Sequence, residues 1–364
     1  MTEQDSQKSG DGGHKRRKRY GGTHPKKFGE KYKERNPQKY PDIHNHLRAK
    51  GKTPAGTHVP IMVEEIISLL KPEAGMVVAD CTIGYGGHAN AFMNCLGAGG
   101  KLVGFDVDSG ELEKTKTRLA GKETPLVVYN KNFAGIASVM GELGIDGFDI
   151  IFADLGVSSM QVDDPSRGIS YKNKGPLDMR MDSRLARTGM DLLEKLSQEE
   201  LSQGLWELSD EPDHEEIAAA IIKQRQVSVI TQTSQLIRLI FDVKRLTIKQ
   251  WKQQQRMRFN TLHPAARTFQ ALRIMVNDEL GVLKELLRIA PDCLKGGGRI
   301  GFLSFHSGED RLVKQSFKEG LKLGIYSSIA KSPITPRIRE IRDNPRSSSA
   351  KFRWAMRTKA LTRH

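Results

Sequence analysis

The sequence predicts an α/β protein with a mostly parallel sheet, interrupted along the chain by an inserted helical domain. Between residues 63 and 154, short apolar runs alternate with segments of helical periodicity. This alternation is typical of parallel strands covered by helices on both faces. Strand signals stop between residues 165 and 264, where helical periodicity alone is found. An apolar run returns at residues 298–305, so we expect the sheet to resume there.

The elements of the sheet domain follow one another in the first half of the chain. Val63–Leu70 has helical spacing and is followed by Lys71-Pro72, where the proline favours a helix end. Runs that are almost wholly apolar predict buried strands, because both faces of a parallel strand are covered. The strands expected here are 76–80, 101–106, 125–129 and 148–154, and the helices between them are 89–96 and 110–119.

Helices dominate the predicted insertion and the segment that follows it. Apolar residues recur at helical spacing over 189–196, 197–208, 215–224 and 232–240. One long helix is expected over 267–287, before the last strand. The domains predicted from these changes are a basic arm at 1–53, a sheet domain at 54–164 and 265–364, and an inserted helical domain at 165–264.

Positive charge is concentrated at the two ends of the chain. The 364 residues include 58 Lys+Arg and 43 Asp+Glu, a formal net charge of +15. Residues 1–53 carry 15 Lys+Arg and 6 Asp+Glu, and residues 331–364 carry 10 and 2, so the body between them is close to neutral. Such ends indicate a polyanion such as nucleic acid as partner, with a solubilising role as the alternative. The first 53 residues are expected to be a flexible arm.

Composition also excludes several classes of protein. No segment approaches the ~20 consecutive apolar residues of a membrane helix, and the first residues lack the apolar stretch of a secretory signal. The three cysteines, Cys81, Cys95 and Cys293, form no C-x-x-C pair, so neither a disulfide framework nor a metal site is expected. These features predict a cytoplasmic protein without a membrane partner or a resident metal.

A glycine-rich turn follows the first predicted strand. Asp80 ends that strand, and Gly84-Tyr-Gly-Gly87 precedes a helix; glycines let a backbone approach a ligand closely. Asp106 ends the second strand, where a carboxylate can bind ribose hydroxyls, as in Rossmann-like folds. The turn lacks the third glycine of a dinucleotide fingerprint, and the carboxylates of Asp80, Asp106 and Asp154 favour a cationic ligand. The sulfonium S-adenosylmethionine is therefore favoured over NAD, the weaker alternative.

Two aromatic side chains near this turn have two interpretations each. His88 lies just inside the predicted helix and is either a ligand contact or a capping or packed histidine. Phe133 follows the third strand, where an adenine could stack on it. A phenylalanine buried in the core is the more common case.

Six segments stand in order between about residue 58 and residue 353: Asp80–His88, Asp154–Gln161, Gly175–Asp182, His263–Arg273, Ser304–Arg311 and Asn344–Lys351. Together they closely resemble the motifs of the RsmH (MraW) methyltransferases. The resemblance implies a class I S-adenosylmethionine-dependent methyltransferase fold that carries an inserted helical domain. The chain departs from the family pattern at Ile169, Tyr171, Ala266, Gly308 and Ser348.

The resemblance also implies an activity and a set of cofactor residues. The family methylates N4 of a decoding-site cytosine in small-subunit (16S) ribosomal RNA, so that RNA or the small ribosomal subunit would be the partner. Carried over by motif, the cofactor residues are Gly86, Gly87, His88, Asp106, Phe133, Asp154 and Gln161. Gln161 has no signal of its own in the sequence. A ribosome-assembly factor that binds cofactor and rRNA with little catalysis is the alternative function.

The chemistry of this reaction selects further candidate residues. Cytosine N4 is a weak nucleophile, so an acceptor for its proton is needed. Asp154 is the leading candidate for that contact or for the methionine part of the cofactor, and backbone carbonyls of the 154–161 loop are an equal alternative. The target base must leave the stack to react. Asp178, Arg180 and His306 are candidates for bordering its pocket, with a loop hydrogen bond or ion pair as an equally good interpretation.

A cationic segment lies near the end of the predicted insertion. Residues 244–258 include six Lys or Arg, two of them in Lys244-Arg245, and one tryptophan, Trp251. The segment is expected to be either an RNA-facing surface or a solvated helix face. The sequence leaves the oligomeric state open, a homodimer included.

Overall fold

The structure, a computed structural model, describes residues 60–257 and 262–359. The chain divides into two compact units, Met1–Thr57 and His58–His364, and the described residues all belong to the second. The arm predicted at 1–53 therefore lies outside the described residues. Throughout the described ranges, every helix is too short or too polar to span a bilayer.

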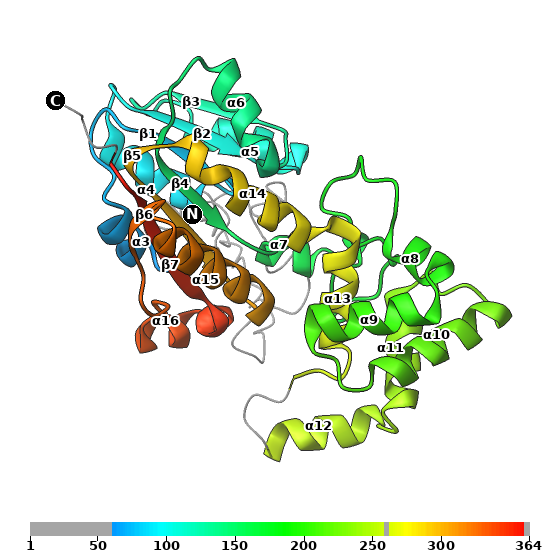
Figure 1. Cartoon of the computed structure of the whole chain (residues 1–364). Helices are drawn as coiled ribbons and strands as arrows, with labels where there is room; N and C mark the ends of the chain where they lie inside the picture. Colours follow the sequence, from blue (N-terminus) through cyan, green and yellow to red (C-terminus); the bar gives the residue numbers. More distant parts are fainter. Residues whose placement is uncertain (1–59, 258–261, 360–364) are drawn as a thin grey trace, which may run out of the picture. The chain divides into compact units, whose positions relative to one another are not determined.

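One mixed sheet forms the centre of the second unit (Figure 1). Its seven strands have the order β3-β2-β1-β4-β5-β7-β6, in which β7 runs antiparallel to both of its neighbours and the other pairs are parallel. The strands are β1 (Val77–Asp80), β2 (Lys101–Phe105), β3 (Leu126–Tyr129), β4 (Phe148–Asp154), β5 (Leu294–Ser304), β6 (Tyr326–Ile329) and β7 (Lys351–Arg357). The predicted α/β fold with a mostly parallel sheet is confirmed.

Helices cover both faces of this sheet, because alternate strand residues point to opposite sides. Val78 and Phe152 pack on one side with the helices α3 and α4, whereas Ala79 and Ile151 pack on the other with α14 and α15. The helices of the sheet domain are α3 (Val63–Leu70), α4 (Gly87–Leu96), α5 (Ser109–Leu119), α6 (Ile136–Glu142), α7 (Ser159–Asp163), α14 (Glu279–Cys293), α15 (Ser307–Lys322) and α16 (Ile338–Asp343), with short 3-10 turns at Phe133–Gly135, Pro165–Arg167 and Pro345–Ser349.

A third hydrophobic core is formed mainly by helices, together with loop residues such as Leu177 and Met179. Leu201, Leu205, Ile221 and Phe269 are buried in it, and α9 packs against both α10 and α13. The helices are α8 (Gly189–Lys195), α9 (Gln198–Ser209), α10 (His214–Val227), α11 (Thr233–Val243), α12 (Ile248–Met257) and α13 (Ala266–Asn277). The helices expected between 189 and 240 are confirmed, while the domain boundaries at 165 and 264 stay predictions.

The prediction of a single helix over residues 267–287 is wrong. The chain instead forms α13 and α14, joined at Asp278, whose φ of 49° lies in the left-handed region and ends α13. Asp and Asn adopt this conformation more readily than other residues with a side chain. The run Asn277-Asp278-Glu279 interrupts the apolar face, and this polar interruption is the signal for the break.

Strands β6 and β7 were not predicted: β6 is a run of four residues that includes two serines, and β7 lies in the cationic C-terminal segment. In β7, basic and apolar residues alternate as in a strand with one polar face. Arg353 is buried and pairs with Asp310, with 2.6 Å between Nε and Oδ1, and Arg357 donates to the Leu294 carbonyl at 2.7 Å. Part of the positive charge at this end therefore holds the fold together and does not face a partner.

We expect Phe269→Ala to lower the free energy of unfolding by about 3–5 kcal/mol, because it removes a buried aromatic ring from the helical core. Urea denaturation followed by circular dichroism measures this change. Trp206→Ala is the control: this ring is 52% exposed, and a loss below about 1 kcal/mol is expected. Equal losses for the two variants would contradict the assignment of Phe269 to a separate packed core.

Candidate functional site

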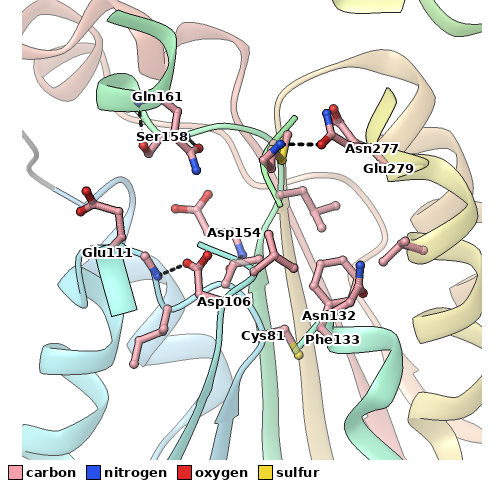
Figure 2. A pocket seen from close by; sticks show the side chains of 18 of the residues that line it. Cys81, Asp106, Glu111, Asn132, Phe133, Asp154, Ser158, Gln161, Asn277 and Glu279 are labelled. Atoms are coloured by element: carbon pink, nitrogen blue, oxygen red, sulfur yellow. Dashed lines mark hydrogen bonds between the residues drawn. The ribbon is translucent and has the colours of Figure 1, made fainter. Parts of the chain in front are cut away.

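A cavity lies at the carboxyl ends of β1, β2 and β4, where ligands bind in open α/β sheets. Figure 2 shows side chains from these strand ends, from the turn at 158–161 and from the start of α14 around one space. Of the residues predicted to bind the cofactor, six line this cavity: Gly87, His88, Asp106, Phe133, Asp154 and Gln161.

The glycine-rich turn between β1 and α4 has backbone angles that other residues rarely adopt. Gly84 and Gly86 have φ values of 43° and 74°. A Cβ atom on Gly86 would lie 2.9 Å from both Leu119 Cδ1 and Thr115 Cγ2, so no larger residue fits without a shift. Gly86 is the residue before α4 and does not line the cavity. The role of Gly86 in the structure is therefore to allow the tight turn before α4.

Asp106, just beyond β2, is bonded to this turn. Its Oδ2 accepts a hydrogen bond from the backbone N–H of Gly84 at 2.9 Å, and its Oδ1 accepts one from Asp108 N at 2.9 Å. Burial raises the pKa of Asp106 to about 6, although these two hydrogen bonds act in the opposite direction. The carboxylate is therefore fixed in position, and each oxygen keeps a second lone pair for a ligand hydroxyl.

Two more carboxyl groups are buried at the neighbouring strand ends. Burial raises the pKa of Asp80 to about 7 and that of Asp154 to about 8, and the Asp80 charge adds to the rise at Asp154. In a space of low polarity, ionised carboxylates close together are costly unless a positive charge compensates them. The cavity is therefore suited to a cation and not to a pyrophosphate.

His88 connects the first turn of α4 to Asp154. Its Nε2 lies 2.9 Å from the Ile61 carbonyl oxygen, so this nitrogen carries the proton and donates it. Its Nδ1 faces Asp154 Oδ2 at 3.5 Å, and the ring lies against Phe152, with 4.9 Å between centroids. The ring is packed, as one interpretation of this histidine expected, and because it also borders the cavity the ligand contact stays a prediction.

Two short helical turns place the remaining predicted residues in the wall. Phe133 begins a 3-10 turn that Asn132 caps by accepting a hydrogen bond from Ala134 N at 3.0 Å. Gln161 lies in α7, where its Oε1 accepts a hydrogen bond from Ser158 N at 3.0 Å in a capping box. The half-buried Phe133 ring presents an aromatic face beyond the end of β3.

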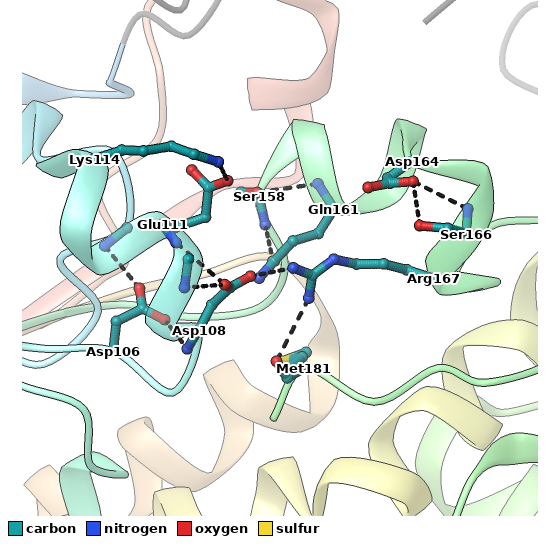
Figure 3. Close-up of polar contacts among 12 residues, drawn as sticks. Asp106, Asp108, Glu111, Lys114, Ser158, Gln161, Asp164, Ser166, Arg167 and Met181 are labelled. Carbon is teal, nitrogen blue, oxygen red and sulfur yellow. Dashed lines mark hydrogen bonds and ion pairs between the residues drawn. The ribbon is translucent and has the colours of Figure 1, made fainter. Parts of the chain in front are cut away.

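The segment after α7 is tied to the sheet domain (Figure 3). Arg167 pairs with Asp108, the residue that caps α5, and also donates to the Met181 carbonyl. Asn277, at the end of α13, accepts a hydrogen bond from Met181 N at 2.7 Å. Met181 is thereby held in the wall of the cavity.

Several cavity residues were missed in the sequence. Met181, Asp182 and Glu309 lie within the motifs quoted above. Asn277 and Glu279 lie at the unpredicted break between α13 and α14, where the polar run 277–279 was the only signal for them. The missed residues include Met181, Asp182, Leu185, Asn277, Glu279 and Glu309.

The candidates on the substrate side do not line this cavity. Asp178 and Arg180 pair with each other in a fork, with 2.8 Å between Arg180 Nε and Asp178 Oδ1, and they line a smaller adjacent cavity that also contacts Met181. His306 precedes α15, and its Nδ1 accepts a hydrogen bond from Gly308 N at 3.2 Å. For all three the structure shows the local hydrogen bond or ion pair that was the alternative interpretation.

Near His306, the structure brings two glutamates together. Possible ligand atoms of Glu279, His306 and Glu309 lie within 4.8 Å of one another. However, Arg273 already binds both oxygens of Glu279, at 2.7 and 2.9 Å. A guanidinium in this place competes with a metal ion for the same carboxylate, so the cluster is described more simply as an ion-pair network.

The sheet order, with β7 as its antiparallel strand, the glycine turn after β1 and the acidic strand ends together define a class I S-adenosylmethionine-dependent methyltransferase fold. The chain belongs to the MraW methylase family, whose model matches residues 55–358. The family resemblance of the sequence motifs is confirmed.

Curated relatives match almost the whole chain. "Ribosomal RNA small subunit methyltransferase H 1" of Lachnoclostridium phytofermentans is 46% identical over 349 residues, which covers 94% of this chain and 93% of the relative. The protein of the same name from Agathobacter rectalis is 46% identical over 356 residues, covering 94% and 98%. "Ribosomal RNA small subunit methyltransferase H 2" of Alkaliphilus metalliredigens is 43% identical over 346 residues, covering 94% and 97%. The alignments to these relatives include more residues than the segment 55–358 that the family model matches.

We expect Asp106→Ala to weaken binding of S-adenosylmethionine by about 10- to 100-fold, because charged hydrogen bonds are lost and the Gly84 N–H loses its acceptor. Isothermal titration calorimetry measures the affinity. Glu113→Ala, which removes an exposed carboxylate that pairs with Lys116 outside the cavity, serves as the control and should bind normally. Unchanged affinity in Asp106→Ala would contradict the assignment of the cavity.

We expect the ligand-free protein to lose stability as the pH rises from about 6 to about 8. The folded-state pKa values of Asp106, Asp80 and Asp154 are raised to about 6, 7 and 8, so the folded state holds protons that the unfolded state has released. Thermal unfolding measured across this pH range checks the trend, and Asp154→Asn should flatten its upper part. A midpoint that rises with pH would contradict the buried-carboxyl description.

Proposed function

We propose that this protein transfers a methyl group from S-adenosylmethionine to N4 of a decoding-site cytosine in small-subunit (16S) ribosomal RNA. The observation that carries the proposal is the pair of carboxyls Asp106 and Asp154, which line the cavity beside the glycine turn, with the buried Asp80 next to them. The names of the relatives, all small-subunit rRNA methyltransferases, support the substrate class. We place the reaction in the cytoplasm, where ribosomes are present.

The residues of the cavity fit this cofactor. When bound, S-adenosylmethionine supplies a methyl group that its sulfonium already activates for transfer. We propose that Asp106 accepts the ribose hydroxyls, that Phe133 packs on the adenine, and that Asp154 with the Gly87–His88 backbone holds the methionine end. Gly86 acts through the turn, since a side chain there would collide with α5. Gln161, held by Ser158, offers its amide N–H₂ group toward the same space.

Asp154 is also our candidate for the acceptor of the proton that the target amine loses. Its raised pKa, about 8, makes the ionised carboxylate a stronger base than an exposed aspartate. His88 faces Asp154 with Nδ1, while its other nitrogen is occupied by the Ile61 carbonyl. Contact with His88 restricts the orientation of the Asp154 carboxyl. A carboxyl held in one orientation can accept the proton from a substrate bound in one defined position.

The target base would approach from the side of the helical insertion. The adjacent small cavity, lined by Arg167, Asp178 and Arg180, supports an entry there, because it shares Val107 and Met181 with the main cavity. We propose that Asp178 and Arg180 order the loop that borders the base, and that His306 positions Glu309 in the opposite wall. The base must be flipped out or unpaired to reach the cavity.

Transfer of a labelled methyl group from S-adenosylmethionine to small ribosomal subunits that lack the modification tests this function. We expect label in the RNA, and mass spectrometry of the nuclease digest should identify N4-methylcytidine. Asp154→Ala should reduce the rate by about 100-fold or more, because it removes both a cofactor contact and the proton acceptor. Tight RNA binding without methyl transfer by the wild-type protein would instead support an assembly factor.

A further inference from the structure

Helix α12 has a cationic face that the reaction described above does not use. Lys249, Lys252 and Arg256 are exposed. At 3.6 residues per turn, their spacing places all three within a sector of about 60° around the helix axis, over a length of about 10 Å. They form one straight row of positive charge, which we call the α12 row.

Within residues 60–257 and 262–359, no carboxylate pairs with the charges of the α12 row. The sequence has no Asp or Glu between Asp242 and Asp278. Lys244, just before the helix, pairs with Glu211 at 2.5 Å and also with Asp213. In contrast, no ion pair joins a residue of the α12 row to any residue in the described ranges. Three like charges so close together repel one another, so a row of this kind favours a polyanion outside the chain.

The opposite side of α12 is attached to the helical core. Trp251 contacts the His263 ring edge-to-face, with 4.6 Å between centroids, and His263 stacks on Tyr171 at 4.2 Å. Trp251 also meets Phe241 at 6.4 Å. Because Trp251 is about 130° from the middle of the α12 row around the axis, this packing leaves the three cations of the row exposed to solvent.

The apolar residues of α12 do not favour a lipid surface. Ile248 and Met257 are 60% and 78% exposed, but they lie on opposite sides of the helix, about 180° apart. An interfacial membrane helix instead has one continuous apolar face opposite its cations. Since charge is present without such a face, the α12 row is better suited to a nucleic-acid backbone.

We propose that the α12 row binds the sugar-phosphate backbone of the RNA substrate, outside the pocket of the reacting base. This proposal rests on the function proposed above and adds to it the element of the insertion that contacts phosphates. Phosphate contacts give affinity and position without reading sequence. The row therefore contributes to RNA affinity and to its salt dependence, and leaves cofactor binding unchanged.

The test uses the full chain with all three residues of the α12 row replaced: Lys249→Gln, Lys252→Gln and Arg256→Gln. Glutamine suits this helix, which already contains four. The probe is small-subunit rRNA that carries a fluorescent label and has no ribosomal proteins bound. Its binding is measured over a range of salt concentrations. We expect about a tenfold or larger loss of affinity near 0.1 M salt, and a salt slope smaller by about 2, or roughly 0.7 per lost phosphate contact.

A matched control removes three exposed lysines from α15 in the sheet domain: Lys314→Gln, Lys318→Gln and Lys322→Gln. It lowers the net charge equally and should keep wild-type RNA affinity. Affinity for S-adenosylmethionine should be the same in all three proteins. If both triple variants weaken RNA binding equally, the loss is explained by net charge alone and the proposal is overturned. Unchanged RNA binding in the α12 variant would also overturn it.

Two further outcomes separate this proposal from others. Vesicles containing anionic phospholipid are tested in parallel, and a loss of vesicle binding without a loss of RNA binding would overturn the proposal in favour of a membrane surface. If RNA binding depends on the α12 row but the wild-type protein transfers no methyl group, the proposed reaction fails and the RNA contact stands.

Discussion

The site depends on three carboxyl groups that are buried together at one edge of the sheet. Asp80, Asp106 and Asp154 follow strands that lie side by side, so the topology itself brings like charges close together. Without a cation these groups are partly neutralised by protonation, as their raised pKa values show. The Gly84 N–H of the glycine turn holds Asp106, and His88 faces Asp154; these two carboxyls line the cavity.

The same site joins the two parts of the second unit. Asp278 ends α13, which packs in the helical core, and α14 starts at the next residue and covers the sheet. Asn277 holds Met181 by a hydrogen bond, and Arg167 connects that segment to Asp108 at the start of α5. A shift of the helical part would therefore be transmitted directly to the cavity wall.

The strand ends and the glycine turn could be predicted from the sequence, because short apolar runs followed by Asp or Gly are local signals. Cavity residues such as Asn277 could not, because they depend on how α13 turns into α14. Asp178 and Arg180 carry the charges of a substrate contact, yet they satisfy each other. Arg353 was counted with a cationic tail, but it is buried against Asp310; charge alone does not indicate what a side chain meets.

The position of β7 within the sheet has a consequence for how the protein is made. This strand lies between β5 and β6, and among the described strands β6 pairs with β7 alone. Since β7 comes last among the described strands, the growing chain leaves the edge of β5 open until translation has passed residue 357. Open strand edges invite intermolecular pairing. The sheet of the nascent polypeptide therefore stays incomplete until β7 has been made.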